Sequence, residues 1–166
     1  MQYTGSSLIG QTIKASAIVA ALVLSTSAGH AQSPPFAGFD GTWSGSGTVL
    51  LSDGSNERLH CRAVYQVDGS GLVLKQTLRC ASDSYKFDLA SDVTSHGDHI
   101  TGNWSETNRN ISGSLLGTAG NGKIDVKVES AGFNATLTLR TTGNKQSVSI
   151  SSKGEIRGVS INMVRG

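Results

Sequence analysis

The chain has 166 residues, a formal net charge of +2 and charged side chains at only 16% of its positions. A charge this small argues against binding to nucleic acid or to anionic lipid, because both require a strongly basic surface. Glycine occurs 21 times and proline twice, a turn-rich composition that is typical of a β protein and not of a helical or disordered one. The length fits one folded domain.

The N-terminal segment has the pattern of an export signal. A lysine precedes the apolar run 15–24, and the small residues Gly29 and Ala31 suit cleavage before Gln32. The run is too short for a membrane anchor, because a spanning helix needs about 20 apolar residues. We therefore predict a signal peptide over residues 1–31, no membrane span after its removal, and a periplasmic or secreted protein.

A short leader, residues 32–40, precedes the folded domain, which we predict over residues 41–166. The leader is rich in proline at its start and cannot form a central strand there. Its two aromatic residues, Phe36 and Phe39, are expected to plug one end of the domain. The first strand is predicted over residues 41–51.

The clearest structural signal is the alternation of apolar and polar residues from Leu59 to Cys80. A period of two residues indicates strands, and the Asp/Gly/Ser joint between two such runs indicates a hairpin. A turn at Ser70–Gly71 places Cys61 directly opposite Cys80, and a turn one residue earlier places the two diagonally. In both registers the thiols face the core, so we predict a Cys61–Cys80 disulfide in an oxidising compartment.

The remaining sequence repeats this alternation, with turn residues such as Gly97–Asp98, Gly143–Asn144 and Lys153–Gly154 between the runs. Each joint keeps the apolar residues on one face, whereas a single slipped register would invert a face. A sheet with one apolar face must close or fold over itself. We therefore predict an all-β, antiparallel up-and-down meander of about ten strands, closed as a small barrel or clam. The alternative is a β-sandwich. The polar outer face excludes an outer-membrane barrel.

The tripeptide Gly41-Thr42-Trp43, at the start of the first predicted strand, resembles the G-x-W opening of lipocalins, fatty-acid-binding proteins and other calycins. The resemblance implies a barrel in which this Trp packs across the bottom, beneath an Arg from near the last strand; Arg157 and Arg165 are the candidates. The helix pair that covers fatty-acid-binding proteins is lacking. The chain after the signal also resembles small exported bacterial proteins of unknown function. This resemblance implies an exported location and says nothing about activity.

Two predicted turns have residue patterns that suggest a phosphate site and a metal site. We interpret both as ordinary turns without a ligand. Gly117–Lys123 has the G-x4-G-K spacing of a phosphate loop. It lacks the following Ser or Thr and joins two strands, whereas a phosphate loop opens a helix. We interpret it as a flexible hairpin loop and predict no cofactor. His96, Asp98 and His99 cluster at another turn, but no distant fourth ligand accompanies them, so we predict no metal site.

Charged residues also gather on the predicted outer face. His60, Arg62, Lys75 and Arg79, with Arg58 nearby, form a basic face that suits an anionic partner or, alternatively, a solvated surface. Another pair, Glu106 and Arg109, flanks one turn and is expected to form a surface ion pair of little energetic value.

The predicted interior offers little for catalysis, because its residues are nearly all apolar and no pair of carboxylates points inward. We predict that the protein is not an enzyme. The first hypothesis is that the interior binds a small hydrophobic ligand. The predicted ligand-binding residues are Tyr65, Gln76, Tyr85, Trp43 and Trp104.

Two alternatives stay open for the interior. Tyr65 and Gln76 are close across the central hairpin and could satisfy each other's hydrogen bonds without a ligand. The interior glycines either leave space for a ligand or make room for the two Trp rings. If the core is filled, the second hypothesis holds: a protein-interaction or inhibitor module that uses its loops or the basic face around Arg62 and Arg79. A cavity of about 300 Å³ or more favours the ligand.

Overall fold

The computed structural model of the protein describes residues 33–166. The predicted signal peptide, residues 1–31, lies outside the described residues. Within residues 33–166 the chain forms ten strands and no helix. The strands are β1 (Gly41–Leu51), β2 (Asn56–Val67), β3 (Val73–Ala81), β4 (Lys86–His96), β5 (His99–Glu106), β6 (Ile111–Gly120), β7 (Lys123–Ser130), β8 (Phe133–Thr142), β9 (Lys145–Ser152) and β10 (Ile156–Arg165).

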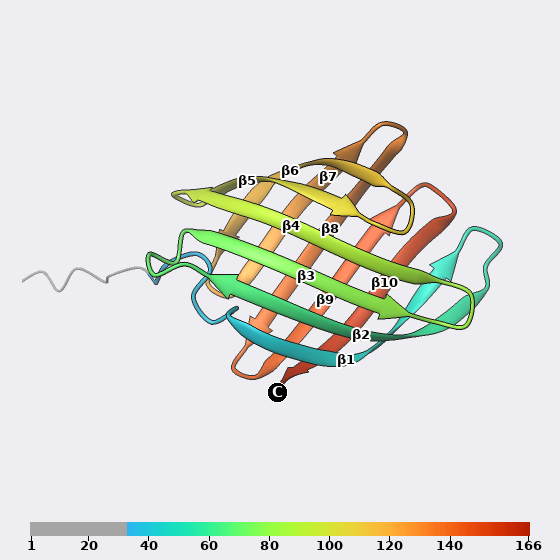
Figure 1. Ribbon diagram of the computed structural model, residues 1–166, viewed down its shortest axis with the longest axis horizontal. Helices are drawn as coiled ribbons and strands as arrows, with labels where there is room; N and C mark the ends of the chain where they lie inside the picture. The colour runs from blue at the N-terminus through green and yellow to red at the C-terminus, as the bar shows by residue number, and fades with distance from the viewer. Residues whose placement is uncertain (1–32) are drawn as a thin grey trace, which may run out of the picture. The chain divides into compact units, whose positions relative to one another are not determined.

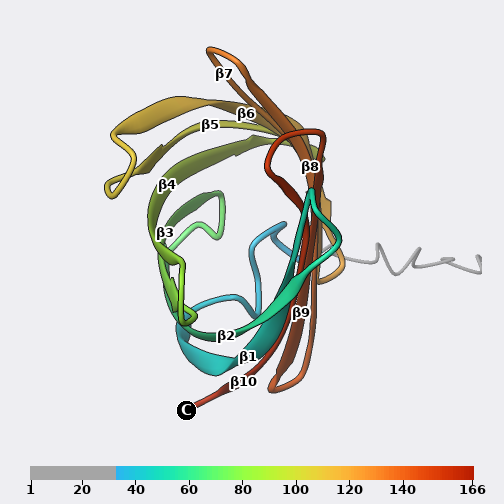
Figure 2. The same ribbon diagram turned by 90° about the vertical axis from the view of Figure 1, so that its right-hand side faces the viewer.

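Every strand pairs antiparallel with its neighbours in the sequence, and β1 pairs with β10 to close a barrel (Figures 1 and 2). Closure leaves no sheet edge with unpaired backbone groups. The predicted meander is confirmed, and the structure is a barrel and not a sandwich. Residues of one parity point into the barrel and form a single hydrophobic core.

The turns alternate between two ends of the barrel because consecutive strands are antiparallel. We call the end with the turns after β2, β4, β6 and β8 the floor, and the end with the turns after β1, β3, β5, β7 and β9 the mouth. Segment 33–40 lies at the floor, where the Phe36 N–H donates a hydrogen bond of 3.3 Å to the Gly71 carbonyl. Phe36 and Phe39 are fully buried, which confirms that they plug this end. In Figure 2 the segment, in blue, lies within the ring of strands.

The central hairpin adopts the register in which Cys61 lies directly opposite Cys80. The two cysteines form the predicted disulfide. Asp68 fixes this register, because its Oδ1 accepts hydrogen bonds of 3.0 and 2.9 Å from the N–H groups of Leu72 and Val73. Hydrogen bonds lower the pKa of Asp68 to about 2. The largest contribution comes from the Ser70 hydroxyl, and backbone N–H groups contribute less.

Trp43 lies across the floor, as the G-x-W resemblance implies. Its indole N–H donates a hydrogen bond of 2.9 Å to the Phe39 carbonyl. The guanidinium of Arg165 lies 4.6 Å from the centre of the Trp43 ring and also donates to the Gly38 carbonyl. Of the two candidate arginines, Arg165 is therefore the one that packs on the Trp. Arg157 lies at the mouth, where it donates to the Lys153 carbonyl.

One expectation about glycines is wrong, and the structure decides between the two alternatives left open for the interior glycines. Strand β6 continues to Gly120, so residues 117–120 are not a loop, and the connection is the two-residue turn Asn121–Gly122 with φ values of 51° and 72°. Positive φ at both residues is the geometry of a tight hairpin turn. The interior glycines do not leave space for a ligand, whereas Gly113 makes room for the Trp104 ring, because a Cβ there would lie 3.0 Å from Trp104 Nε1. A Cβ on each would lie 1.8–2.2 Å from a carbonyl oxygen of a neighbouring strand, so they allow close strand contact. These glycines are Gly45, Gly47, Gly102 and Gly113.

Candidate ligand-binding site

The barrel encloses a cavity of about 340 Å³ between the floor and the mouth. Its wall is mainly apolar, because alternate residues of the strands face inward. The wall includes Leu74, Leu78, Val93, Ile100, Leu115 and Val148. Arg109 and Glu155, from two of the mouth turns, also line it, so the cavity extends to the mouth. Its volume falls within the range of small-molecule sites.

Three of the five predicted ligand-binding residues lie on the cavity wall: Tyr65, Gln76 and Trp104. The other two are not part of the wall. Trp43 lies beneath it at the floor and is fully buried. Tyr85 lies in the β3–β4 connection at the mouth and is half-buried.

Tyr65 and Gln76 are directly opposite each other in the register, but they do not satisfy each other. The Tyr65 hydroxyl crosses the barrel and donates a hydrogen bond of 2.9 Å to Gln146 Oε1, and Gln146 Nε2 donates one of 3.0 Å to Thr141 Oγ1. Burial raises the pKa of Tyr65, and the hydrogen bond to Gln146 offsets only part of this effect. Sequence reasoning missed Gln146, although it shares the inward parity of Val148.

Gln76 is the polar position in the wall between Leu74 and Leu78. Ser91 lies directly opposite on β4, and its hydroxyl donates a hydrogen bond of 3.3 Å to Gln76 Oε1. In the part of the chain that the structure describes, no hydrogen bond joins Gln76 Nε2 to a protein acceptor. In the same part of the chain, every buried side-chain nitrogen and oxygen has a hydrogen-bond partner. Because Gln76 Nε2 has none, it is not buried and faces accessible space. A donor is therefore free on the cavity wall.

Trp104 lies on the wall with its ring edge against Phe133, the two ring centres 5.9 Å apart. Its indole N–H donates a hydrogen bond of 3.2 Å to the Ser114 carbonyl on the neighbouring strand. The Trp104 N–H is therefore occupied, and the ring offers the cavity an apolar surface.

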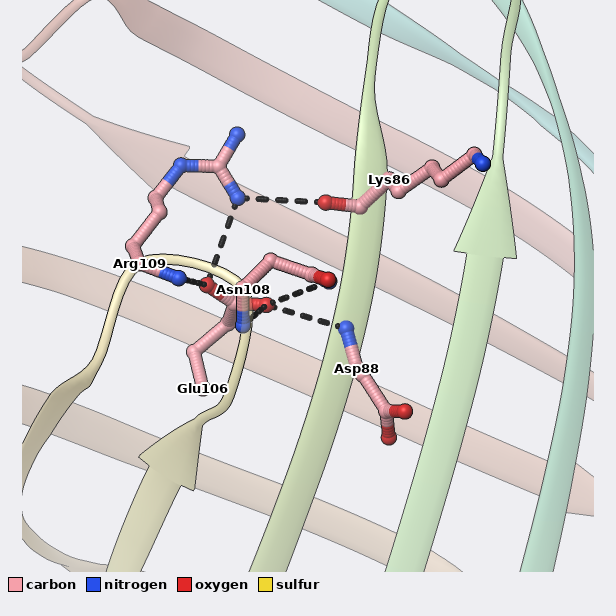
Figure 3. A network of polar contacts seen from close by, with 5 residues as sticks. All are labelled: Lys86, Asp88, Glu106, Asn108 and Arg109. Atoms are coloured by element: carbon pink, nitrogen blue, oxygen red, sulfur yellow. Dashed lines mark hydrogen bonds and ion pairs between the residues drawn. The ribbon is translucent and has the colours of Figure 1, made fainter.

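A network around Glu106 borders the cavity at the mouth (Figure 3). The predicted ion pair between Glu106 and Arg109 forms, but the Glu106 side chain is only 3% exposed, so the pair is not a surface pair. Its carboxylate accepts hydrogen bonds of 3.0, 3.1 and 2.8 Å from the N–H groups of Asp88, Asn108 and Arg109. The side chains of Asn108 and Arg109 add contacts of 3.0 and 3.4 Å. Glu106 shares the inward parity of Trp104, a signal that could have placed it inside.

Burial alone would raise the pKa of Glu106, but the hydrogen bonds from these N–H groups outweigh it, so the pKa lies below its usual value. The carboxylate thus stays ionised and its lone pairs are occupied. Arg109 is held by Glu106 and by a hydrogen bond of 3.2 Å to the Lys86 carbonyl. Its guanidinium lies 4.8 Å from the centre of the Phe87 ring.

Tyr85 belongs to the rim of the mouth. Its ring stacks on Phe87 with the two ring centres 6.2 Å apart, and its hydroxyl donates a hydrogen bond of 2.9 Å to Glu155 Oε1. This hydrogen bond, more than any other effect, raises the pKa of Tyr85. The phenol is occupied by the protein itself.

No protein-family model and no curated protein matches the chain. Among solved structures it is similar to the S-type phycobiliprotein lyase CPES from Guillardia theta, with a TM-score of 0.56 and 10% sequence identity over 76% of this chain and 88% of that chain. The chain has a lipocalin-like barrel fold. An identity this low establishes likeness of fold alone.

The barrel wall also carries the basic face predicted from the sequence, on the outside of β2 and β3. Arg62 lies directly opposite Arg79. Arg79 pairs with Asp88 at 3.1 Å and Lys75 with Asp92 at 3.2 Å, whereas Arg62 forms no ion pair with residues 33–166. A surface hollow of about 460 Å³ lies here and includes His60, Arg62, Arg79 and Lys86 in its lining.

The turn with His96, Asp98 and His99 brings His99 Nδ1 to 3.7 Å from Asp98 Oδ1, and both side chains are exposed. Over the described range, no three His, Cys, Asp or Glu residues are grouped so that they could hold a metal ion. Nor does any helix within that range have the length and apolarity to cross a membrane.

Proposed function

We propose that the protein is an exported barrel that binds a small hydrophobic ligand in its interior and is not an enzyme. The observation that carries the proposal is the cavity of about 340 Å³ with an apolar wall. Apolar wall area stabilises a bound apolar molecule by removing its surface from water. A filled core would have left no such volume, because protein interiors otherwise pack to near-crystalline density.

The polar groups around the cavity support binding over catalysis. Glu106 has a lowered pKa and five hydrogen-bond contacts, so it is a poor proton donor and a saturated acceptor. The Tyr65 hydroxyl is buried with a raised pKa and donates to Gln146. Both groups therefore stabilise the barrel, and neither is poised to exchange protons with a substrate at neutral pH.

Export is part of the proposal, and the Cys61–Cys80 disulfide supports it, because stable disulfides form in oxidising compartments. Expression from the full-length sequence should yield protein whose first residue is Gln32 or lies within a few residues of it. Intact mass measurement reports this directly. Retention of Met1 on the purified protein would contradict export by a cleaved signal.

The ligand proposal is tested by native mass spectrometry of that purified protein and by titration with N-phenyl-1-naphthylamine, a neutral probe that fluoresces in apolar surroundings. We expect saturable binding. Ala135 is buried on the cavity wall and Thr136 is its exposed neighbour on β8. Ala135→Trp should abolish the signal by filling the cavity, and the matched control Thr136→Trp should not. Equal signals from both variants would place the probe outside the barrel.

A second candidate is a protein-interaction or inhibitor module that uses the basic face. The observation that favours it is the hollow beside Arg62 and Arg79, where Arg62 has no carboxylate partner among residues 33–166. It requires an anionic partner surface. The charge reversal Arg62→Glu should abolish binding to such a partner and leave probe uptake unchanged, which separates the two functions.

A further inference from the structure

We infer that the ligand carries a neutral hydrogen-bond acceptor, a carbonyl, ester or ether oxygen, within its apolar body, and that Gln76 donates to it. The inference rests on the proposed function and names the ligand class of the same cavity. The polar groups that face the cavity differ in whether the protein supplies them with a hydrogen-bond partner.

The protein satisfies most of these groups itself. Tyr65 donates to Gln146, Trp104 donates to the Ser114 carbonyl, and Glu106 accepts from the turn that follows it. Ser91 donates to Gln76 Oε1. These hydrogen bonds leave Gln76 Nε2 as the neutral side-chain donor on the cavity wall that has no acceptor within residues 33–166.

The position of Gln76 defines where the acceptor must lie. On the inward face of β3 it stands between Leu74 and Leu78, and all three side chains line the cavity. A pure hydrocarbon here would take Nε2 out of contact with water and offer no hydrogen bond, which is costly. A ligand with an acceptor at this depth avoids that cost. A site that hydrogen-bonds one ligand rejects the analogue that lacks the group.

The acceptor is neutral for a separate reason. The nearest inward residues of β3 on either side of Gln76 are leucines, and no cation lies among the inward residues of this strand. An ionised group at this depth would lose its hydration without a compensating charge. Arg109, the cation that lines the cavity, lies at the mouth and is held by Glu106.

The test uses two probes of nearly the same shape, benzophenone and diphenylmethane, which differ by a carbonyl in place of a methylene group. Each displaces N-phenyl-1-naphthylamine from the purified protein, and the measured quantity is the ratio of the two dissociation constants. Relative to wild type, Gln76→Leu should shift this ratio toward diphenylmethane by about tenfold, the effect of one buried hydrogen bond. The matched control Gln66→Leu, on the outward face of β2, should leave the ratio unchanged.

Each outcome is decisive. An unchanged ratio in Gln76→Leu overturns this inference and leaves the proposed function standing, because both probes still bind. If neither probe displaces N-phenyl-1-naphthylamine from wild type, the proposed function and the inference fail together.

A measurement on wild type does not depend on the folding of the variant. The side-chain amide signals of Gln76 in a nitrogen-15 NMR spectrum should shift on addition of benzophenone more than on addition of diphenylmethane. Equal shifts of these signals with both probes would overturn the inference.

Discussion

The floor and the mouth of the barrel are built on different principles. At the floor, Phe36, Phe39 and Trp43 are fully buried, and Arg165 covers the indole from outside. At the mouth, Phe87 and Phe133 are only half-buried, and the guanidinium of Arg109 lies over the Phe87 ring. The floor is thus a sealed apolar core, whereas the mouth is held by hydrogen bonds around a charged group. If the proposed function holds, we expect the ligand to enter the cavity from the mouth.

The sharpest test of this contrast compares the two tryptophans. Trp43→Ala should lower the free energy of unfolding by about 3–5 kcal/mol, because the fully buried ring leaves a void at the floor. Trp104→Ala should cost less, because its ring already borders the cavity. Urea denaturation measures both values. Equal losses would contradict a packed floor and a hollow interior.

The disulfide stabilises the half of the β2–β3 hairpin that is nearer the mouth. Replacing both Cys61 and Cys80 with Ala should cost about 2–5 kcal/mol, because the bond closes a loop with a sequence separation of 19. Urea denaturation of the oxidised protein and the double variant measures the loss. Recovery of both cysteines as free thiols, in non-reducing peptide maps of the purified protein, would contradict the bond.

Glu106 tests whether the mouth depends on its charged centre. Glu106→Gln should lower the free energy of unfolding by about 1.5–3 kcal/mol at pH 7, because hydrogen bonds to a charged acceptor are replaced by weaker ones. The folded pKa lies below the unfolded value, so the contribution of the ionised carboxylate is present above the unfolded pKa, about 4.3. It is lost as the pH falls through the folded pKa.

The difference in unfolding free energy between wild type and Glu106→Gln should therefore be constant near neutral pH and shrink below about pH 4. Urea denaturation at pH 7 and at acidic pH measures it. The matched control is Glu129→Gln, an exposed carboxylate on β7, which should show no loss at pH 7. A pH-independent loss in Glu106→Gln would contradict a role for the charge.

The smallest expected effect concerns the arginines at the two ends. Arg165→Leu removes the cation from the Trp43 ring and should cost about 0.5–1 kcal/mol, the value for an exposed cation–π contact. Arg157→Leu, at the mouth, should change the free energy of unfolding by less. Thermal unfolding compares the two. A larger loss for Arg157→Leu would contradict the asymmetry of the barrel.

The sequence could predict the fold because alternation is a local property. Between Leu59 and Cys80 the residue pattern determines which side chains face inward, and the same parity places Gln146 and Glu106 inside. It could not predict the partner of Tyr65, because Gln146 is 81 positions away and closure of the barrel decides which side chains meet across the interior. The cavity volume likewise depends on how inward side chains from all ten strands fill the space.

The central claim is that the interior is a ligand cavity, and the N-phenyl-1-naphthylamine titration of wild type tests it most directly. The cavity of about 340 Å³ predicts one saturable site, whose signal disappears in Ala135→Trp and persists in Thr136→Trp. The absence of saturable binding in wild type that carries no retained ligand in its native mass spectrum would contradict the claim.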